Sequence, residues 1–264
     1  MSKPLIPAQR RERIQEFLVA NRIARTADLC ALLDASEATV RRDLEWLEQE
    51  GIVERTHGGA ILSQRMPLEP GYQQRALTFP DEKRHIGALA ASLIEPNDVV
   101  FVNSGTTTTE VIRHTRGDPS ISIFTNNLSG AFEVGEPGFQ YFVIGGEFQP
   151  RSNSLAGRFA MENLAQVFAT RAILGVDGIS LRHGCTVPSN AEAEIIRQMI
   201  KQTRVEIIIV ADHSKWGVVS NFQIAAIGEI TRFISDPGLD PVAAEALMEH
   251  GVQIHVASPS PVGT

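Results

Sequence analysis

The sequence is poor in cysteine, has no long apolar run and carries no excess of positive charge. Its two cysteines, Cys30 and Cys185, lie far apart among 264 residues and form no CxxC pair. That scarcity argues against a disulfide framework and a zinc site, so we expect no metal and a reducing compartment, the cytoplasm by default. No segment approaches the ~20 consecutive apolar residues that span a bilayer. The start MSKPLIPAQRRERI also lacks the apolar stretch of a signal peptide, so we expect no membrane partner.

The shortage of positive charge limits what composition can say about nucleic acids. The chain carries 24 Lys and Arg against 31 Asp and Glu, a net charge of −7. Residues 1–62 are nearly neutral, with nine basic and ten acidic side chains. Any DNA-binding function must then depend on where individual arginines lie, because the overall charge does not attract phosphate.

Residues 1–62 nevertheless show the pattern of three short helices followed by a hairpin. Each helix has apolar residues at helical spacing, in turn Ile14, Phe17 and Leu18; Leu29, Leu32 and Leu33; and Val40, Leu44 and Leu47. Thr26 and Ser36 are predicted N-caps of the second and third helices, and Gly51 ends the third. The segment IVERTHGGAIL has β-branched residues around Gly58 and Gly59, which is typical of a hairpin. Together these features predict a winged helix-turn-helix.

The third helix and the hairpin carry the side chains that we expect to contact DNA. In a helix-turn-helix, the recognition helix enters the major groove with its N-terminal residues against base edges. Arginine suits that place because its planar fork pairs with guanine or phosphate, and a glycine turn lets backbone approach the sugar-phosphate chain. A plain solvated helix face, with Arg42 paired to Glu45 or Glu48, is the competing interpretation. The candidate DNA-binding residues are Ser36, Thr39, Arg41, Arg42, Arg55, His57 and Gly58.

Residues 63–80 are rich in proline and glycine and are predicted to form a linker to a second region. Residues 81–258 then alternate short apolar runs with amphipathic segments, and residues 259–264 form a tail. The predicted strands are DVVFVNSG, ISIFTNN, YFVIGG, RAILGVDGIS, EIIIVADHS, TRFISD and VQIHVAS, and the predicted helices span residues 159–169, 192–202 and 241–250. This alternation predicts the α/β class, with a mostly parallel sheet covered on both faces.

The segment NSGTTTT lies where a predicted buried strand turns into a helix. Free N–H groups at a helix N-terminus bind anions, and the helix dipole adds to that attraction. The spacing is not that of a P-loop. Four successive threonines are costly at a helix start, which favours an anion site over a simple cap. The candidate ligand-binding residues here are Asn103, Ser104, Gly105, Thr106 and Thr107.

Further polar groups follow the other predicted strands, at the ends where open α/β sheets bind ligands. The residues at these ends are Asn126 and Asn127, Gly145 with Gly146, Asp177, and Asp212 with Lys215. Lys215 can neutralise an anion, and either aspartate can accept hydrogen bonds from sugar hydroxyls. Each residue also has a plain interpretation as a turn or cap, but together they favour a site for a small polyhydroxylated anion.

The segments TADLCALLDASEATVRRDLEWLEQEGIVERTHGGA, EKRHIGALAASLIEPNDVVFVNSGTTTTEV, GVDGIS and DHSK closely resemble the DeoR family of bacterial transcriptional regulators. The resemblance covers the chain apart from its ends. It implies a regulator of carbohydrate catabolism genes, most often a repressor. It also implies a sensor domain that resembles the ribose-phosphate isomerase and CoA-transferase fold and binds a phosphorylated sugar. By the same resemblance Ser104, Gly105, Thr106 and Thr107 hold the phosphate, and Asn126, Asp177 and Lys215 surround the sugar.

The resemblance also implies partners and shows one departure. The expected partners are a double-stranded DNA operator, a small-molecule effector and further copies of the chain, as a dimer or tetramer, with no cofactor. Half-sites would lie about one helical turn (~34 Å) apart or a multiple of it. The family usually has Asp before Ser-Gly-Thr-Thr, where this chain has Asn103, so the usual effectors transfer only loosely.

Two alternatives stay open. Asp177, Asp212 and Lys215 could supply acid–base chemistry, which would make the chain a sugar-phosphate isomerase or deaminase-like enzyme with an accessory DNA-binding head. Kinship of fold does not imply retained activity and no spacing compels catalysis, so we assign no catalytic residue. The second alternative is a regulator that responds to a non-phosphorylated ligand, because of Asn103.

Overall fold

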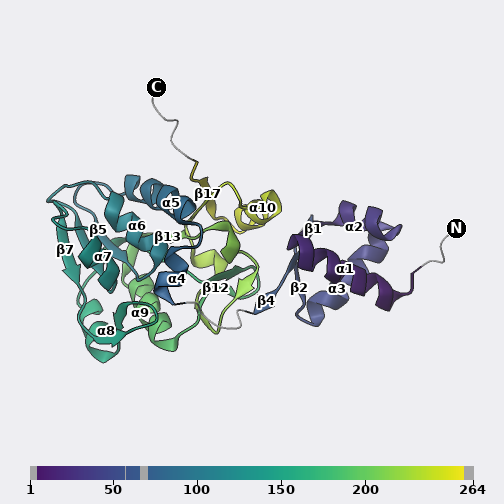
Figure 1. Ribbon diagram of the computed structural model, residues 1–264, viewed down its shortest axis with the longest axis horizontal. Helices are drawn as coiled ribbons and strands as arrows, with labels where there is room; N and C mark the ends of the chain where they lie inside the picture. The colour runs from purple at the N-terminus through teal and green to yellow at the C-terminus, as the bar shows by residue number, and fades with distance from the viewer. Residues whose placement is uncertain (1–4, 57, 66–70, 259–264) are drawn as a thin grey trace, which may run out of the picture.

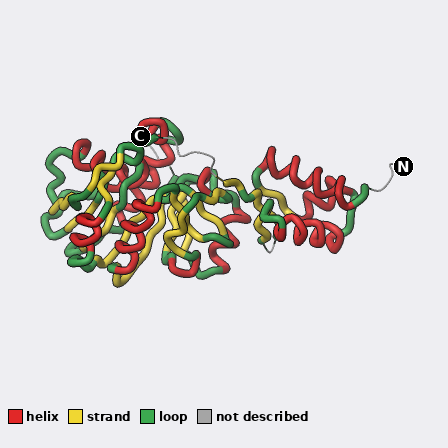
Figure 2. Tube along the Cα trace, turned by 90° about the horizontal axis from the view of Figure 1, so that it is seen from below, coloured by secondary structure: helices red, strands yellow, loops and turns green. Residues whose placement is uncertain are grey.

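The computed structural model describes residues 5–56, 58–65 and 71–258, which form a smaller and a larger region (Figures 1 and 2). We call residues 5–62 the head and residues 71–258 the α/β domain. The head is built from helices around a small sheet, and the α/β domain from helices on both sides of a parallel sheet. The expected fold class, a small winged helix-turn-helix joined to a larger α/β domain, is confirmed.

The head contains three helices and a three-stranded antiparallel sheet. The helices are α1 Pro7–Asn21, α2 Thr26–Leu33 and α3 Glu37–Gln49, and the strands are β1 Ile23–Arg25, β2 Val53–Arg55 and β3 Gly59–Leu62. The strand order is β1-β3-β2, so β3 is central. One apolar core joins these elements, and its buried members include Ile14, Leu18, Leu29, Leu33, Val40, Leu44, Leu47, Val53 and Ala60.

Two details of the predicted helices differ in the structure. Leu32 is 38% exposed, because the buried face of α2 is set by Leu29 and Leu33, four residues apart. Helix α2 begins at Thr26 itself, with Arg25 in the cap position, since Arg25 ends strand β1. The predicted stop of α3 is confirmed: Gly51 has φ +72°, and it donates to the carbonyl of Glu48 at 2.9 Å.

Strand β1 was not predicted from the sequence. It has only three residues and pairs with β3 so that Ala24 lies opposite Ala60. A Cβ on Gly59 would lie 2.0 Å from the carbonyl oxygen of Ala24, so only glycine allows the two strands this close. Gly59 is therefore explained by packing inside the head.

The α/β domain is built on seven parallel strands, and each strand predicted from the sequence is present. Their order is β17-β16-β13-β10-β5-β6-β7. The bounds are β5 Val99–Val102, β6 Ser122–Thr125, β7 Gln140–Val143, β10 Ala169–Gly175, β13 Thr203–Val210, β16 Arg232–Ser235 and β17 Gln253–Val256. The order reverses direction between β5 and β10, which is the point where open α/β sheets bind ligands.

Helices cover both faces of this sheet (Figure 1). Helices α5 Pro80–Ser92, α6 Thr106–His114 and α7 Leu128–Glu133 pack on one face. Helices α8 Arg158–Leu164, α9 Asn190–Lys201 and α10 Pro241–Glu249 supply buried residues to the core on the other face. The helix predicted over residues 159–169 ends at Leu164, because Ala169 already begins β10.

Smaller strand pairings surround the main sheet. Strands β11 Gly178–Ser180, β12 Gly184–Val187 and β15 Phe222–Ala225 form an antiparallel sheet, and β8 Glu147–Gln149 pairs with β9 Ser154–Ala156. The predicted strand RAILGVDGIS breaks after Gly175 and resumes as β11, which leaves Asp177 between two strands. This break exposes Asp177 to a cavity described below.

The described parts of the predicted linker are ordered and pack on the α/β domain. Strand β4 Gln64–Arg65 pairs with β14 Val218–Val219, and helix α4 covers Tyr72–Ala76. The hydroxyl of Tyr72 lies 2.9 Å from Oγ1 of Thr109 on α6. The content of proline and glycine predicted a linker there, but it carried no information about this strand, this helix or their contacts with the α/β domain.

Candidate functional site

The structure presents two candidate sites, one on the head and one in the α/β domain. On the head, α3 begins at a side-chain cap, as predicted. The hydroxyl of Ser36 accepts a hydrogen bond from the N–H of Thr39 at 3.4 Å, and the two hydroxyl oxygens lie 2.9 Å apart. This pair fixes the first turn of α3, which carries the next two candidates.

Arg41 and Arg42 are exposed on the N-terminal half of α3. Arg41 forms an ion pair with Glu37 at 2.6 Å, yet its side chain is 57% exposed. Among the described residues no ion pair is recorded for Arg42, so the alternative pairing with Glu45 or Glu48 is absent from this structure. Both guanidinium groups are therefore open to solvent on the face that the winged helix-turn-helix pattern assigns to DNA.

Asp43, on the same helix, has a structural role. Its carboxylate is buried and accepts from Nε of Arg10 at 2.6 Å and from Nε of Arg11 at 3.2 Å. This aspartate therefore braces two arginines of α1. The pairing neutralises the only carboxylate buried along α3 and ties α1 to it.

The hairpin between β2 and β3 brings the remaining head candidates together in part. We call the hairpin of β2 and β3 the wing, and α3 the recognition helix. Arg55 is half-buried and its guanidinium lies 3.1 Å from the carboxylate of Glu45 on α3, so an ion pair joins the wing to the recognition helix. Gly58 is exposed, and nothing lies within 4 Å of the position its Cβ would take. His57 lies outside the described residues. The turn at Gly58 leaves room for a close approach of another backbone.

In the α/β domain, a cavity lies at the carboxyl ends of β5 and β10, where the strand order reverses. Its lining includes Asn103, Ser104, Gly105, Thr106, Thr107, Gly175, Asp177, Asp212 and Lys215, together with Arg75, Thr78, Lys83 and Glu192. The first turn of α6 forms one wall, and its leading N–H groups have no partner within the helix. Such a wall attracts an anion.

The loop before α6 is held by buried amide side chains. Nδ2 of Asn103 donates to the carbonyl of Gly175 at 2.9 Å, and its Oδ1 accepts from the N–H of Gly175 at 2.8 Å. An aspartate there could make only the second bond, which explains physically why asparagine fits. Among the described residues no hydrogen bond is recorded for the hydroxyls of Ser104 and Thr106, which line the cavity.

Two of the predicted ligand residues do not line this cavity. Asn126 is buried, where its Oδ1 accepts from the N–H of Ser104 and its Nδ2 donates to the carbonyl of Leu155. Through these two hydrogen bonds Asn126 holds the loop before α6 in place without lining the cavity. Gly145 is exposed after β7, the edge strand of the sheet, so its place in the fold separates it from the strand reversal. Direct ligand contacts by these two residues stay a prediction.

The cavity lining does contain Asp177, Asp212 and Lys215, but both carboxylates already accept hydrogen bonds from other residues of the chain. Asp177 accepts from the guanidinium of Arg75 at 3.0 Å. Asp212 caps the short 3-10 helix His213–Lys215 and accepts from the N–H of Ser214 at 3.0 Å. Lys215 also lines the cavity, and in the described part of the chain its ammonium group forms no ion pair.

Sequence reasoning missed three charged residues of this cavity, Arg75, Lys83 and Glu192. Lys83 is only 4% exposed, and its ammonium donates to the carbonyls of Arg75 at 2.5 Å and Thr78 at 2.7 Å. Arg75 lies in the stretch that was predicted to be a linker, and Lys83 and Glu192 lie in the first turns of amphipathic helices. The sequence offered one signal for Lys83 and Glu192, which is a charged side chain on the apolar face of a helix in its first turn.

Burial shifts the acid–base behaviour of two groups. Loss of contact with water lowers the pKa of Lys83 from its ordinary value to about 8, and the nearby Asp212 opposes the shift. Burial also raises the pKa of the Cys185 thiol, which makes the thiol inert as a nucleophile. Cys30 packs against the core of the head.

Residues 5–56, 58–65 and 71–258 contain no group of three or more His, Cys, Asp or Glu side chains placed to hold a metal ion. Over the same ranges, no helix is both long and apolar enough to cross a membrane.

Comparison with known proteins identifies both regions. Residues 10–65 match the DeoR-like helix-turn-helix domain, and residues 78–237 match the DeoR C terminal sensor domain. The chain is 33% identical to the HTH-type transcriptional repressor GlcR of Bacillus subtilis, over 92% of this chain and 93% of that protein. It is 34% identical to the HTH-type transcriptional regulator GlpR of Haloferax volcanii, over 95% of this chain and 98% of that protein.

A solved structure, ribose 5-phosphate isomerase A of Methanocaldococcus jannaschii, also matches. The match has a TM-score of 0.37 and 12% identity, and it covers 52% of this chain and 54% of that chain. That similarity is too low to carry a functional inference. The two domain matches and the full-length relatives agree with the geometry of the head, and the chain belongs to the DeoR family of transcriptional regulators.

Proposed function

We propose that this regulator is a repressor that binds operator DNA through the first turns of α3 and the wing, and leaves it when a phosphorylated sugar binds the α/β domain. A role at DNA would place the chain in the cytoplasm. The relative GlcR is named a repressor, which supports repression over activation for this chain. Ser36, Thr39, Arg41, Arg42, Arg55, His57 and Gly58 are the residues proposed to contact or position DNA.

The observation that carries the effector proposal is the composition of the cavity. Three cations, Arg75, Lys83 and Lys215, line the same cavity as the N-terminal turn of α6. Carboxylates of Asp177, Glu192 and Asp212 lie in the same lining. Cations and free N–H groups suit a phosphate, while carboxylates accept hydrogen bonds from hydroxyls. One ligand that carries both groups is a sugar phosphate.

The effector must favour one of two arrangements of the regulator. Only a ligand with different affinities for the DNA-binding and DNA-released states can shift their equilibrium. Two copies of the head are expected to bind two half-sites, so we also propose a homo-oligomer, either a dimer or a tetramer.

Catalysis is the weaker reading of the same cavity. Lys83, with a pKa of about 8, is the group best suited to move a proton. Its hydrogen bonds to two backbone carbonyls give it a structural use instead, because they hold the end of α4 and the residues that follow it against the cavity. We therefore propose a binding site without turnover.

The test combines a ligand screen with a DNA-binding assay. Sugar phosphates and sugar acids are screened by thermal shift, and each ligand that stabilises the protein is then added to a gel shift with the intergenic DNA upstream of its gene. We expect a sugar phosphate to raise the melting temperature and release the DNA. Stabilisation by sugar acids alone would support the non-phosphorylated alternative, and chemical conversion of the ligand would revive the enzyme.

A further inference from the structure

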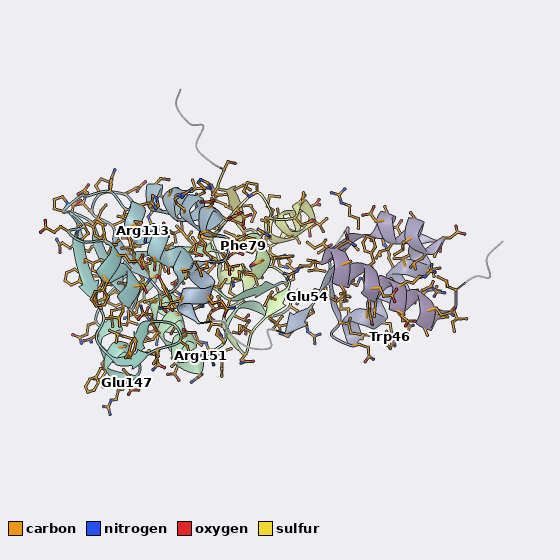
Figure 3. The ribbon with its side chains drawn as sticks, viewed as in Figure 1. Trp46, Glu54, Phe79, Arg113, Glu147 and Arg151 are labelled. Atoms are coloured by element: carbon orange, nitrogen blue, oxygen red, sulfur yellow. The ribbon has the colours of Figure 1, made fainter. Side chains whose placement is uncertain are left out.

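The head and the α/β domain touch through the wing, and the contact is specific. Oε2 of Glu54, on β2, accepts a hydrogen bond from the backbone N–H of Leu181 at 2.8 Å. Arg22 of the head donates to the carbonyl of Ser214 at 3.3 Å. Figure 3 shows Glu54 where the two regions meet. The two partners in the α/β domain lie in connecting segments, Leu181 in the turn after β11 and Ser214 in the short 3-10 helix His213–Lys215, and we call these segments its loops.

Those loops are the ones that carry cavity residues. Leu181 directly follows β11, and β11 begins next to Asp177. Ser214 immediately precedes Lys215. The backbone of Gly217 donates to the carbonyl of Ile179 at 2.9 Å, which ties the two loops together. A ligand that moves Asp177 or Lys215 thus moves the surface on which the wing rests.

Only one of the two carboxylate oxygens of Glu54 accepts a hydrogen bond in this contact. The residue is 5% exposed, and its second carboxylate oxygen, Oε1, has no hydrogen-bond partner among the described residues. A buried carboxylate oxygen without a partner costs free energy that is recovered when the group returns to water. We call the arrangement in which the head rests on the α/β domain through Glu54 and Arg22 the docked arrangement. The cost of burying Oε1 of Glu54 favours its opening.

The docked arrangement also encloses part of the proposed DNA surface. One groove is lined on the head by Thr26, Arg41, Leu44, Arg55, Thr56 and Gly59, and on the α/β domain by Leu181, Glu249 and His250. Glu249 ends α10, where the helix dipole is negative and the carboxylate adds further negative charge. A DNA phosphate near Arg41 and Arg55 would meet this negative end.

We infer that the docked arrangement is the DNA-excluding state, that Glu54 holds it through Leu181, and that an anion in the cavity controls DNA binding by stabilising this contact. The inference rests on the proposed function of the head. It assigns Glu54 a positioning role with no direct contact to DNA or effector. The switch has two states because the contact either forms as a unit or opens and rehydrates the carboxylate.

The first test compares Glu54→Ala with Glu54→Gln in the full chain. The probe is a mixed-sequence duplex at about 50 mM salt, where phosphate contacts dominate binding. Alanine removes the acceptor, so we expect duplex affinity to rise about tenfold, within the usual range of coupling between two states. Glutamine keeps an acceptor oxygen for Leu181 and should stay within about twofold of wild type. Hydrogen exchange at residues 178–187 should be faster only in the alanine variant.

A second pair of variants covers the case in which Glu54→Ala does not fold. Glu249→Lys and Glu245→Lys add the same charge to α10, but only Glu249 lines the groove. We expect Glu249→Lys to bind the duplex about fivefold more tightly than Glu245→Lys.

The outcomes separate the inference from the proposed function. Equal affinities within both pairs, in folded proteins that bind the duplex, would overturn the DNA-excluding role of the docked state. Failure of every protein to bind any duplex at low salt would overturn the proposed function, and the inference with it. A rise in affinity for Glu54→Ala or Glu249→Lys over its partner variant supports the switch.

Discussion

The head and the α/β domain use cations in opposite ways. On the head, Arg41 and Arg42 extend into solvent from the start of α3. In the α/β domain, Lys83 is buried with its ammonium fixed by two carbonyls, and Arg75 is paired with Asp177. Exposed guanidinium groups suit a reversible contact with a large polyanion, where counterion release supplies affinity. Fixed cations in a cavity suit discrimination of one small anion, because their geometry is set before binding.

The largest expected effect breaks the internal brace of the head. Asp43→Ala removes a buried carboxylate that accepts from Arg10 and Arg11. We expect a loss of about 2 kcal/mol in the free energy of unfolding of the head, below the cost of a fully buried pair because both arginines keep access to water. Urea unfolding followed by Trp46 fluorescence measures it. Glu16→Ala, an exposed change on α1, is the control, and equal stability of the two variants would contradict the brace.

The next effect tests the exposed cations directly. Arg42→Ala should weaken binding to upstream DNA about tenfold and reduce the slope of log affinity against log salt by about one. Fluorescence anisotropy at several salt concentrations gives both quantities. Arg158→Ala, on the exposed side of α8, removes the same charge from the other region. If the two variants bind DNA equally well, the assignment of α3 as the recognition helix is wrong.

A smaller effect sharpens the view of the cavity wall. Asn103→Asp should lower stability by about 1 kcal/mol, because the carboxylate cannot donate to the carbonyl of Gly175 and faces it instead. Thermal unfolding of the α/β domain measures the change. Asn163→Asp adds the same charge on the exposed side of α8 and should leave stability within about 0.5 kcal/mol of wild type. Two unchanged proteins would show that the amide of Asn103 is not needed.

The smallest effect concerns pH. The pKa of Lys83 is lowered to about 8, below its ordinary value. The unfolded chain therefore binds more protons than the folded chain between that pH and the ordinary lysine pKa, so stability should rise with pH in this window.

Affinity for an anion should fall about fourfold from pH 7 to pH 8.5 as Lys83 loses its charge. Calorimetric titration of a stabilising sugar phosphate measures this. Lys83→Met should remove the pH dependence and Lys201→Met should keep it, whereas a flat wild-type profile would argue against a charged Lys83.

The sequence was informative where local rules decide structure. Strands of continuous Val and Ile, the cap at Ser36 and the stop at Gly51 follow from local sequence, and so does the position of NSGTTTT between a strand and a helix. The sequence was silent where distant segments meet. The contact of β1 with Gly59, the entry of Arg75 into the cavity and the bond from Leu181 to Glu54 depend on tertiary packing. Gly145 shows the limit of the strand-end argument, because it follows the edge strand β7 and lies outside the cavity lining, which is drawn from the ends of β5, β10 and β13.

The central claim is that DNA and a sugar phosphate bind different states of this regulator. Thermodynamic linkage requires each ligand to weaken the other by the same factor. The direct measurement is calorimetric titration of the stabilising sugar phosphate into the protein alone and into the protein saturated with upstream DNA. We predict an affinity about tenfold lower in the presence of DNA. The same affinity in both titrations, for a duplex that the protein binds, would contradict the account.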